Sequence, residues 1–188
     1  MLFEQCRRTN ELMKDFTKPW FIAGGWAIDL FIGKETREHQ DIEISIFRKD
    51  QLYIKDYLKN WDFHKVINGE FELWNGDFLE LPIHEIHAEN TLNGDSLEVL
   101  LNETNENAWL FRREPTICFP ADLVGGWSEE GIPYLRPEIV LLYKAKEPRE
   151  KDHQDFFHAK EYLNQSQKKW LQNAIQVHIP GHPWVEEL

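Results

Sequence analysis

The hydrophobic positions of this 188-residue chain follow two different periods. Toward both ends they recur every three to four residues, which is typical of amphipathic helices. Through roughly 62–135, short runs are separated by Asn-Gly and Gly-Gly turns, and this pattern indicates a meander of strands. Helices are expected at residues 3–16, 26–32, about 49–59, 137–146, about 150–163 and 166–177.

A strand, a glycine turn and a helix are predicted in succession near the N-terminus. The apolar run Trp20–Ala23 has the length of a short strand, and Gly24-Gly25 ends it. Helical spacing resumes over Trp26–Ile32, and the next residue, Gly33, is a usual helix-stop residue. Because the turn comes directly before a helix, its backbone N–H groups and the helix N-terminus can face a phosphate group.

Two later strands are predicted to carry carboxylates on one face. In Asp41–Phe47, three isoleucines alternate with Asp41, Glu43 and a serine. A period of two places the isoleucines in the core and both acids on the opposite face. The segment Ser96–Leu101 alternates in the same way, with Glu98 opposite its apolar residues. We therefore expect Asp41, Glu43 and Glu98 to form a carboxylate triad across the sheet.

These elements predict an α+β fold in one compact unit. A core through residues 1–120 is expected to hold the sheet, and residues 121–188 are expected to form a mainly helical portion packed on that core. The chain length fits one such domain. Its 41% hydrophobic and 29% charged residues are typical of a globular protein.

The charge of the chain bears on its partners. There are 33 Asp and Glu residues against 21 Lys and Arg, which leaves a formal charge of −12. Such a surface repels a phosphate backbone, so we do not expect a nucleic-acid partner. The same field would attract a cationic small molecule, although solubility alone also explains it.

Cysteine usage and hydropathy indicate a cytoplasmic protein without a membrane partner. Cys6 and Cys118 lie far apart and outside any CxxC pattern, which fits a reducing compartment. The first residues are charged throughout and lack the apolar core of a signal peptide. The longest apolar run, around Ile139–Tyr143, is too short to span a bilayer.

The glycine turn and the acids together supply what transfer of a nucleotidyl group requires. Glycine lets backbone N–H groups approach phosphates. Carboxylates hold Mg²⁺ between the phosphates, because hard cations take oxygen ligands, and two such ions can stabilise the incoming and leaving oxygens. A further carboxylate or base can accept the proton of the attacking hydroxyl. Each part alone is a weak signal, and their joint order along the chain favours this chemistry.

The same residues carry a family resemblance. The stretch FIAGGWAIDLFIGKETREHQDIEISIFR resembles the aminoglycoside nucleotidyltransferase-like branch of the polymerase-beta-type nucleotidyltransferase superfamily. The signature of that branch is a Gly-Gly turn followed by a D-x-D or D-x-E pair on the next core strand, which Gly24, Gly25, Asp41 and Glu43 match. The similarity continues through FRREP, YLRPEIVLLYKAK, REKDHQDF and PGHPW.

The resemblance implies both a fold and an activity. The fold would be a nucleotidyltransferase-type mixed sheet flanked by helices. The activity would be transfer of a nucleoside monophosphate from ATP or another nucleoside triphosphate, with two Mg²⁺ ions, to a hydroxyl of a small molecule. An aminoglycoside-like compound is one such acceptor, and the acidic surface agrees with it.

Two acids depart from the family pattern, since Glu43 stands for the second Asp and Glu98 for the third. The extra methylene shifts the carboxylate oxygens, and Mg²⁺ demands near-ideal octahedral geometry. Asp95 is an alternative third acid, although its parity is opposite to that of Glu98. Two rival hypotheses follow: a non-catalytic nucleotide- or metabolite-binding relative, and a toxin-like nucleotidyltransferase that modifies tRNA or protein. The net charge argues against the second.

Several basic residues are candidate phosphate contacts. Lys144, near the end of a predicted helix, could neutralise the triphosphate as charge shifts to pyrophosphate, and the helix dipole is the alternative explanation for it. Arg37 and His39 lie in the loop before the acid pair, close enough to contact a phosphate or the substrate, and Arg37 is the candidate nucleotide contact. For His39, a simple hydrogen bond of the loop is the alternative explanation and is the one expected. Asp152 and Asp155 are expected to pair with the nearby basic residues.

Two remaining pairs are expected to be structural. Arg112 and Arg113 form a small basic spot, and pairing with local acids is its default explanation. His84 and His87 do not share a strand face, so no metal site is expected between them.

Overall fold

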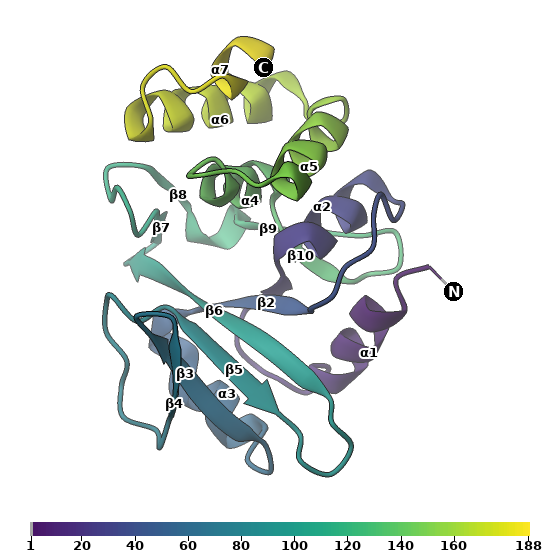
Figure 1. The fold of residues 1–188 in the computed structure, drawn as a ribbon, viewed down its shortest axis with the longest axis vertical. Helices are drawn as coiled ribbons and strands as arrows, with labels where there is room; N and C mark the ends of the chain where they lie inside the picture. Colours follow the sequence, from purple (N-terminus) through teal and green to yellow (C-terminus); the bar gives the residue numbers. More distant parts are fainter. Residues whose placement is uncertain (1) are drawn as a thin grey trace.

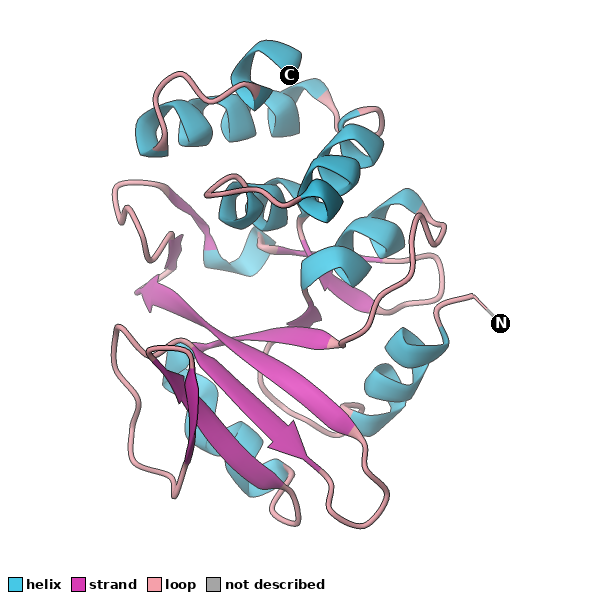
Figure 2. Cartoon of the chain, in the orientation of Figure 1, coloured by secondary structure: helices cyan, strands magenta, loops and turns pink. Residues whose placement is uncertain are grey.

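A mixed sheet forms the centre of the protein, and helices cover its two faces (Figures 1 and 2). This computed structural model describes residues 2–188. The strands are β1 (Trp20–Ile22), β2 (Glu43–Phe47), β3 (Asp62–Ile67), β4 (Glu70–Leu73), β5 (Glu85–Glu89), β6 (Ser96–Asn105), β7 (Ala108–Leu110), β8 (Cys118–Pro120), β9 (Gly125–Trp127) and β10 (Pro133–Leu135). The helices are α1 (Glu4–Leu12), α2 (Gly24–Ile32), α3 (Gln51–Tyr57), α4 (Pro137–Lys144), α5 (Glu150–Lys160), α6 (Gln165–His178) and α7 (Trp184–Glu187), with single 3-10 turns at Arg48–Asp50 and Ala121–Leu123.

The order of the strands places β2 and β6 at the centre of the sheet. The order is β4-β3-β5-β6-β2-β1-β10-β9, and the far end of β6 pairs with β7, which pairs with β8. β2 runs parallel to β6 and β1 runs parallel to β10, whereas the other pairs are antiparallel. The predicted α+β fold with a mixed sheet is confirmed.

The elements agree with the sequence pattern at most positions. Gly33 ends α2 in the left-handed conformation, and Pro137 is the first residue of α4, both as expected. The D-x-E strand is shorter than predicted, because β2 begins at Glu43 and leaves Asp41 just before it. The short C-terminal helix α7 was not predicted. The division near residue 120 stays a prediction, although β9 and β10 still belong to the sheet beyond it.

Two hydrophobic clusters hold the layers together. One lies between α1, α3 and one face of the sheet, and it contains Ile44 and Ile46, which the alternation predicted to be buried. The other joins α2 to the helices α4–α7 above the opposite face. In that cluster Phe156 of α5 stacks on Trp184 of α7, with ring centroids 4.2 Å apart and planes at 3°. The C-terminal helices are therefore packed on the layer that covers the sheet.

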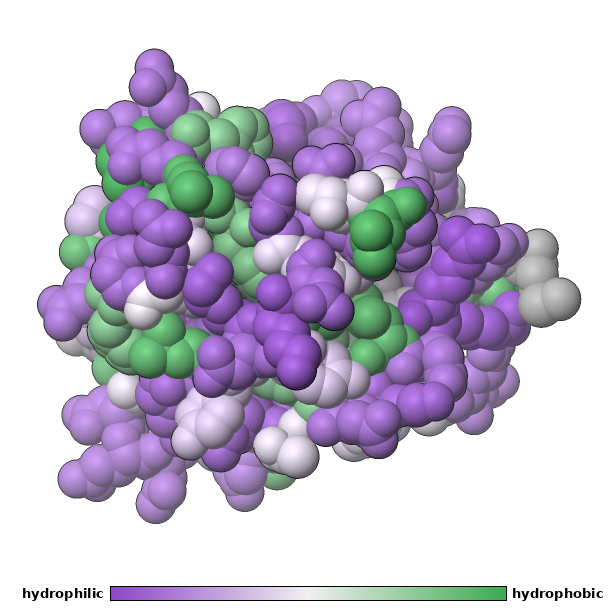
Figure 3. Space-filling view, turned by 90° about the horizontal axis from the view of Figure 1, so that it is seen from below, coloured by the Kyte–Doolittle hydropathy of each residue, from purple (hydrophilic) through white to green (hydrophobic). Residues whose placement is uncertain are grey.

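The surface is charged, in agreement with the composition. Seen from below, the molecule is mostly hydrophilic, with apolar areas between the hydrophilic side chains (Figure 3). Over residues 2–188, no helix has the length and apolar character needed to cross a membrane.

Candidate active site

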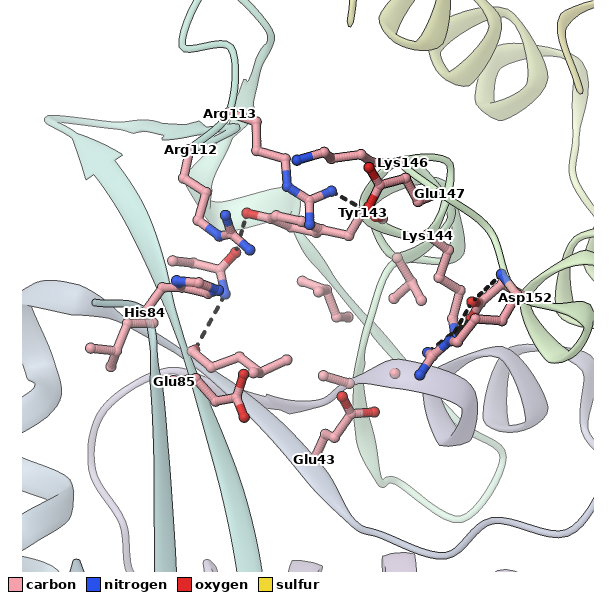
Figure 4. A pocket seen from close by; sticks show the side chains of 18 residues that line it. Glu43, His84, Glu85, Arg112, Arg113, Tyr143, Lys144, Lys146, Glu147 and Asp152 are labelled. Atoms are coloured by element: carbon pink, nitrogen blue, oxygen red, sulfur yellow. Dashed lines mark hydrogen bonds and ion pairs between the residues drawn. The ribbon is translucent and has the colours of Figure 1, made fainter. Parts of the chain in front are cut away.

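A pocket of about 410 Å³ lies above the sheet, bounded by β2, β5, β6 and α4 (Figure 4). Glu43 and Glu85 line it on the sheet side. Gly24, the first residue of α2, also lines it. Strand register decides which other side chains reach this region.

The register of three strands brings acidic side chains together. Glu43 of β2 is paired with Glu98 of β6, and Glu98 is paired with His87 of β5. Residues paired across strands project from the same face of a sheet. Glu85, two residues before His87, shares that face because side chains alternate along a strand. Glu43 and Glu98 are thus neighbours on one face, as the alternation predicted, and β5 adds two residues to that face.

His87 links two of these acids. Its Nε2 atom lies 2.7 Å from Oε1 of Glu85, and its Nδ1 atom lies 3.8 Å from Oε1 of Glu98. One ligand-type atom from each of these three residues lies within 4.8 Å of the others. His84 does not join them, because its Nδ1 atom contacts the backbone oxygen of Pro82 at 2.8 Å. His87, and not His84, thus belongs to an acid cluster that the sequence did not reveal.

The Glu43 carboxylate lies directly over Gly24. A Cβ atom built on Gly24 would lie 1.4 Å from Oε2 of Glu43, so a larger residue cannot occupy this position unless Glu43 moves. Gly24 also has a φ of +57°, which favours glycine. At Gly25, a Cβ atom would collide with Arg37 and His39 in the same way. Both glycines thus permit close approach of side chains from the β2 region, and their role toward phosphates stays a prediction.

The gathered carboxylates disfavour one another's ionised form. Burial raises the pKa of Glu43. Lys144 opposes this shift, whereas the negative charges of Glu85 and Asp41 add to it. Burial raises the pKa of Glu98 to about 7, with His87 opposing the shift and Glu43 and the other acids adding to it. A divalent cation would relieve this repulsion, and carboxylate oxygens are the ligands that Mg²⁺ takes.

Glu98 belongs to the acid cluster but does not itself line the pocket, and the other predicted acids lie outside both. Asp41 is exposed and does not line the pocket, and its backbone oxygen accepts a hydrogen bond from Trp26 Nε1 at 3.2 Å. Asp95 is exposed in the β5–β6 turn, where Asn93 Nδ2 donates to its carboxylate at 2.7 Å. It borders a different hollow beside α1. Asp95 therefore does not join the acid cluster, whereas Glu85 does.

Buried ion pairs connect the loop before β2 with α4 and α5. Lys144 Nζ lies 2.7 Å from Asp152 and 3.0 Å from Asp155, and Arg37 contacts both oxygens of Asp155 at 2.8 and 2.9 Å. The expected pairing of the two aspartates is confirmed. His39 contacts the buried carboxylate of Asp29 at 2.6 Å, in keeping with the hydrogen-bonding role expected for it. Lys144 lines the pocket, and a phosphate contact by Lys144 or Arg37 stays a prediction.

The sequence matches a known family over most of its length. The family described as aminoglycoside-2''-adenylyltransferase matches residues 6–158, a span that includes the glycine turn, the acid cluster and most of α5. The chain belongs to this family. The resemblance found in the sequence is confirmed, and the protein is a nucleotidyltransferase. Among curated proteins, the search found no significant match.

Solved structures of antibiotic adenylyltransferases share this fold. The lincosamide antibiotic adenylyltransferase LnuA in its lincomycin-bound form has a TM-score of 0.60 at 18% identity, covering 86% of this chain and 99% of LnuA. The solution structure of the antibiotic-resistance factor ANT(2'')-Ia has a TM-score of 0.61 at 16% identity, covering 94% of each chain. The crystal structure of ANT(2")-Ia in complex with adenylyl-2"-tobramycin has a TM-score of 0.61 at 16% identity, covering 92% of this chain and 98% of the other. At these identities the likeness shows the fold alone.

One expectation about this adenylyltransferase-family chain is wrong. Arg112 and Arg113 do not pair with acids. Within residues 2–188, no guanidinium nitrogen of either arginine lies within 4.0 Å of a carboxylate oxygen. Arg113 Nη1 instead donates to the backbone oxygen of Tyr143 at 2.8 Å. Both guanidinium groups lie near the Tyr143 ring, at 5.4 and 5.6 Å from its centroid. Both residues line the pocket.

The sequence contained a signal for the acids that were missed. In β5, Glu85, His87 and Glu89 alternate with Ile86 and Ala88, which are buried. This is the same alternation that identified Glu43. Its position in the site depends on β5 pairing with β6, which the local pattern does not reveal.

Proposed function

We propose that this protein transfers a nucleoside monophosphate from a nucleoside triphosphate to a hydroxyl group of a small molecule. ATP is the first candidate for the donor, because the family is one of adenylyltransferases. The observation that supports the proposal is that Glu43 and Glu85 line the pocket beside Gly24, with Glu98 next to them on the same face of the sheet. An aminoglycoside-like acceptor is the candidate that the family description suggests.

In this proposal the acid cluster holds Mg²⁺, with two ions as the family resemblance implies. Glu43 and Glu98 are the central ligands in this proposal, and Asp41, which lies just before β2, would be a further ligand. The donor atoms are carboxylate oxygens, which are the ligands that a hard cation takes. When bound, Mg²⁺ neutralises charge on the phosphates and orients them.

The residues of the chain have separate roles in the transfer. The acceptor hydroxyl oxygen forms a bond to the α-phosphorus, the bond from that phosphorus to the bridging oxygen of the β-phosphate breaks, and pyrophosphate leaves. Glu85 accepts the hydroxyl proton, because it lines the pocket beside Glu43. His87 orients Glu85 through the 2.7 Å contact. Lys144 and the backbone at Gly24 face the leaving pyrophosphate.

Binding of the donor is tested by thermal shift with ATP and Mg²⁺. We expect a magnesium-dependent rise in Tm for the wild type and its loss in Glu43→Gln, because a neutral amide removes the ligand charge. Glu72→Gln is the matched control, since Glu72 is exposed on β4. An unchanged shift in Glu43→Gln combined with Asp41→Ala would refute the assignment of the metal site.

Turnover is tested by release of pyrophosphate with pools of small hydroxylated acceptors. Glu85→Gln is expected to keep the magnesium-ATP thermal shift and to lose about 10²- to 10⁴-fold in kcat, as removal of a general base does. Binding without pyrophosphate release from any pool would support a non-catalytic protein instead. Release that depends on added tRNA or protein would support the toxin-like alternative.

A further inference from the structure

Arg112 and Arg113 lie on the side of the pocket opposite the one from which Lys144 comes. Figure 4 shows the two arginines on one side, Lys144 and Asp152 on the other, and Glu43 between and below them. The two arginines follow β7, on the short segment that leads to β8. The pocket therefore has two separate basic groups, one on each side of the acids.

The two basic groups differ in how their charge is neutralised. Lys144 contacts two aspartates, as described above. Arg112 and Arg113 are half-buried and are held by the Tyr143 ring and its backbone oxygen, which carry no negative charge. Burial raises the pKa of Tyr143 to about 12, so its hydroxyl group stays neutral at physiological pH. Two adjacent positive charges thus face the pocket without a paired carboxylate.

Burial makes this arrangement costly in the absence of a ligand. Burial lowers the pKa of Arg112, and the neighbouring charge of Arg113 lowers it further. Burial also lowers the pKa of Arg113, while Glu147 opposes the shift from a distance. Lys146 lines the same pocket and adds a third positive charge. An oxyanion placed between these groups would relieve their repulsion, and guanidinium groups match carboxylate and phosphate oxygens geometrically.

The geometry of the reaction indicates which substrate reaches the arginines. This step rests on the proposed function. In an in-line displacement, the attacking oxygen and the leaving pyrophosphate lie on opposite sides of the phosphorus. With pyrophosphate on the side of Lys144 and the α-phosphate at Glu43, the acceptor must enter from the opposite side, where Arg112 and Arg113 lie.

We infer that Arg112 and Arg113 bind an oxyanion of the acceptor, which is therefore a small hydroxylated molecule that carries a carboxylate or phosphate group. A polycationic acceptor such as an aminoglycoside would place positive charge against two guanidinium groups. The net charge of −12 is a property of the whole surface, whereas the pocket carries five Lys and Arg side chains against four Asp and Glu. The local charge, and not the net charge, selects the acceptor.

Steady-state kinetics with the 188-residue protein test the inference. Acceptors are compared in three charge classes, namely hydroxy acids and sugar phosphates, neutral sugars, and aminoglycosides, with pyrophosphate release as the readout. We expect turnover with an anionic acceptor, and a rise of about ten- to a hundredfold in its KM in the variant carrying Arg112→Gln and Arg113→Gln, with the KM for ATP unchanged. Arg8→Gln, on the exposed side of α1, is the control and should change neither value.

Two kinetic results would overturn the inference. Preferred turnover of aminoglycosides over the anionic acceptors would show that the arginines do not select the acceptor. A rise in the KM for ATP in the double variant, with the acceptor KM unchanged, would assign the oxyanion site to the nucleotide.

A binding measurement keeps the inference testable if the protein shows no turnover. With Mg²⁺ and a non-hydrolysable ATP analogue present, inorganic phosphate should raise the Tm of the wild type and of Arg8→Gln but not that of the double variant. Equal phosphate effects in all three proteins would overturn the inference. Failure of the proposed function would appear separately, as absence of pyrophosphate release in proteins that still bind phosphate.

Discussion

The contact between Gly24 and Glu43 leads to a sharp prediction for the variant Gly24→Ala. The added Cβ would lie 1.4 Å from Glu43 Oε2, and such contacts essentially never fall below 3.0 Å. The carboxylate must therefore move by about 1.6 Å, the difference between these two distances. It can do so without unfolding the protein, because it is the end of a flexible side chain.

The expected losses in stability and in activity differ in size. A non-glycine residue in the left-handed region costs about 1–2 kcal/mol, which corresponds to about 2–8 °C in Tm for a domain of this size. Misplacement of a catalytic group by about 1 Å costs roughly a hundredfold in rate. We therefore expect Gly24→Ala to lose at least about a hundredfold in kcat/KM, together with the magnesium-ATP thermal shift.

Gly33 supplies the matched control for this experiment. Its φ is +84°, also in the left-handed region, but a Cβ built on it meets nothing within 4 Å. Gly33→Ala should therefore lower Tm by a similar amount and leave pyrophosphate release intact. If Gly24→Ala kept the activity of Gly33→Ala, the placement of Glu43 over Gly24 would not be required for function. If both variants lost activity equally, strain in α2 would be the cause, and the reasoning from the Glu43 contact would be refuted.

Three further predictions concern charge. Asp155→Asn should lower the free energy of unfolding in urea by about 3–5 kcal/mol, because two basic partners lose their buried carboxylate. Glu130→Gln, which breaks an exposed pair, should have a much smaller effect. Because the pKa of Glu98 is raised to about 7, its protonated form favours the fold, so metal-free stability should fall as pH rises from about 4.5 to 7, and Glu98→Gln should flatten that slope. For Asp152, burial alone would raise the pKa, but hydrogen bonds from its basic partners hold it well below the usual range. The free energy of unfolding should therefore also fall as pH drops below about 4, and this fall should be smaller in Asp152→Asn. Denaturant titrations at several pH values measure the pH dependence for Glu98 and for Asp152.

Local patterns in the sequence were sufficient for much of the fold and for part of the site. The alternation of isoleucines with acids predicted which face Glu43 would occupy, because side chains in a strand must alternate between core and surface. Gly33 and Pro137 marked a helix end and a helix start, because their backbone conformations are restricted in known ways. The parity of Glu98 placed it on the face that it shares with Glu43.

The composition of the site depended on contacts between distant parts of the chain. Glu85 and His87 reach the acids only because β5 pairs with β6 in one register, and a shift of one residue would turn both away. Asp41 and Asp95 have the right chemistry, but Asp41 lies before the start of β2 and Asp95 lies in a turn, so both are exposed and neither lines the pocket. No local pattern reports such pairing.

Some charge pairs could be predicted from the sequence, whereas others were decided by the tertiary structure. Asp155 and Lys144 lie eleven residues apart and were expected to pair, because neighbouring helices bring such residues together. Arg112 and Arg113 were expected to find acids as well, yet the fold places them on a pocket wall beside Tyr143. Sequence by itself determined the elements, their buried faces and the family, because these follow from local periodicity and from the motif. Only the tertiary structure decided which charges are neutralised and which face the pocket, because electrostatic interactions depend on distance in space.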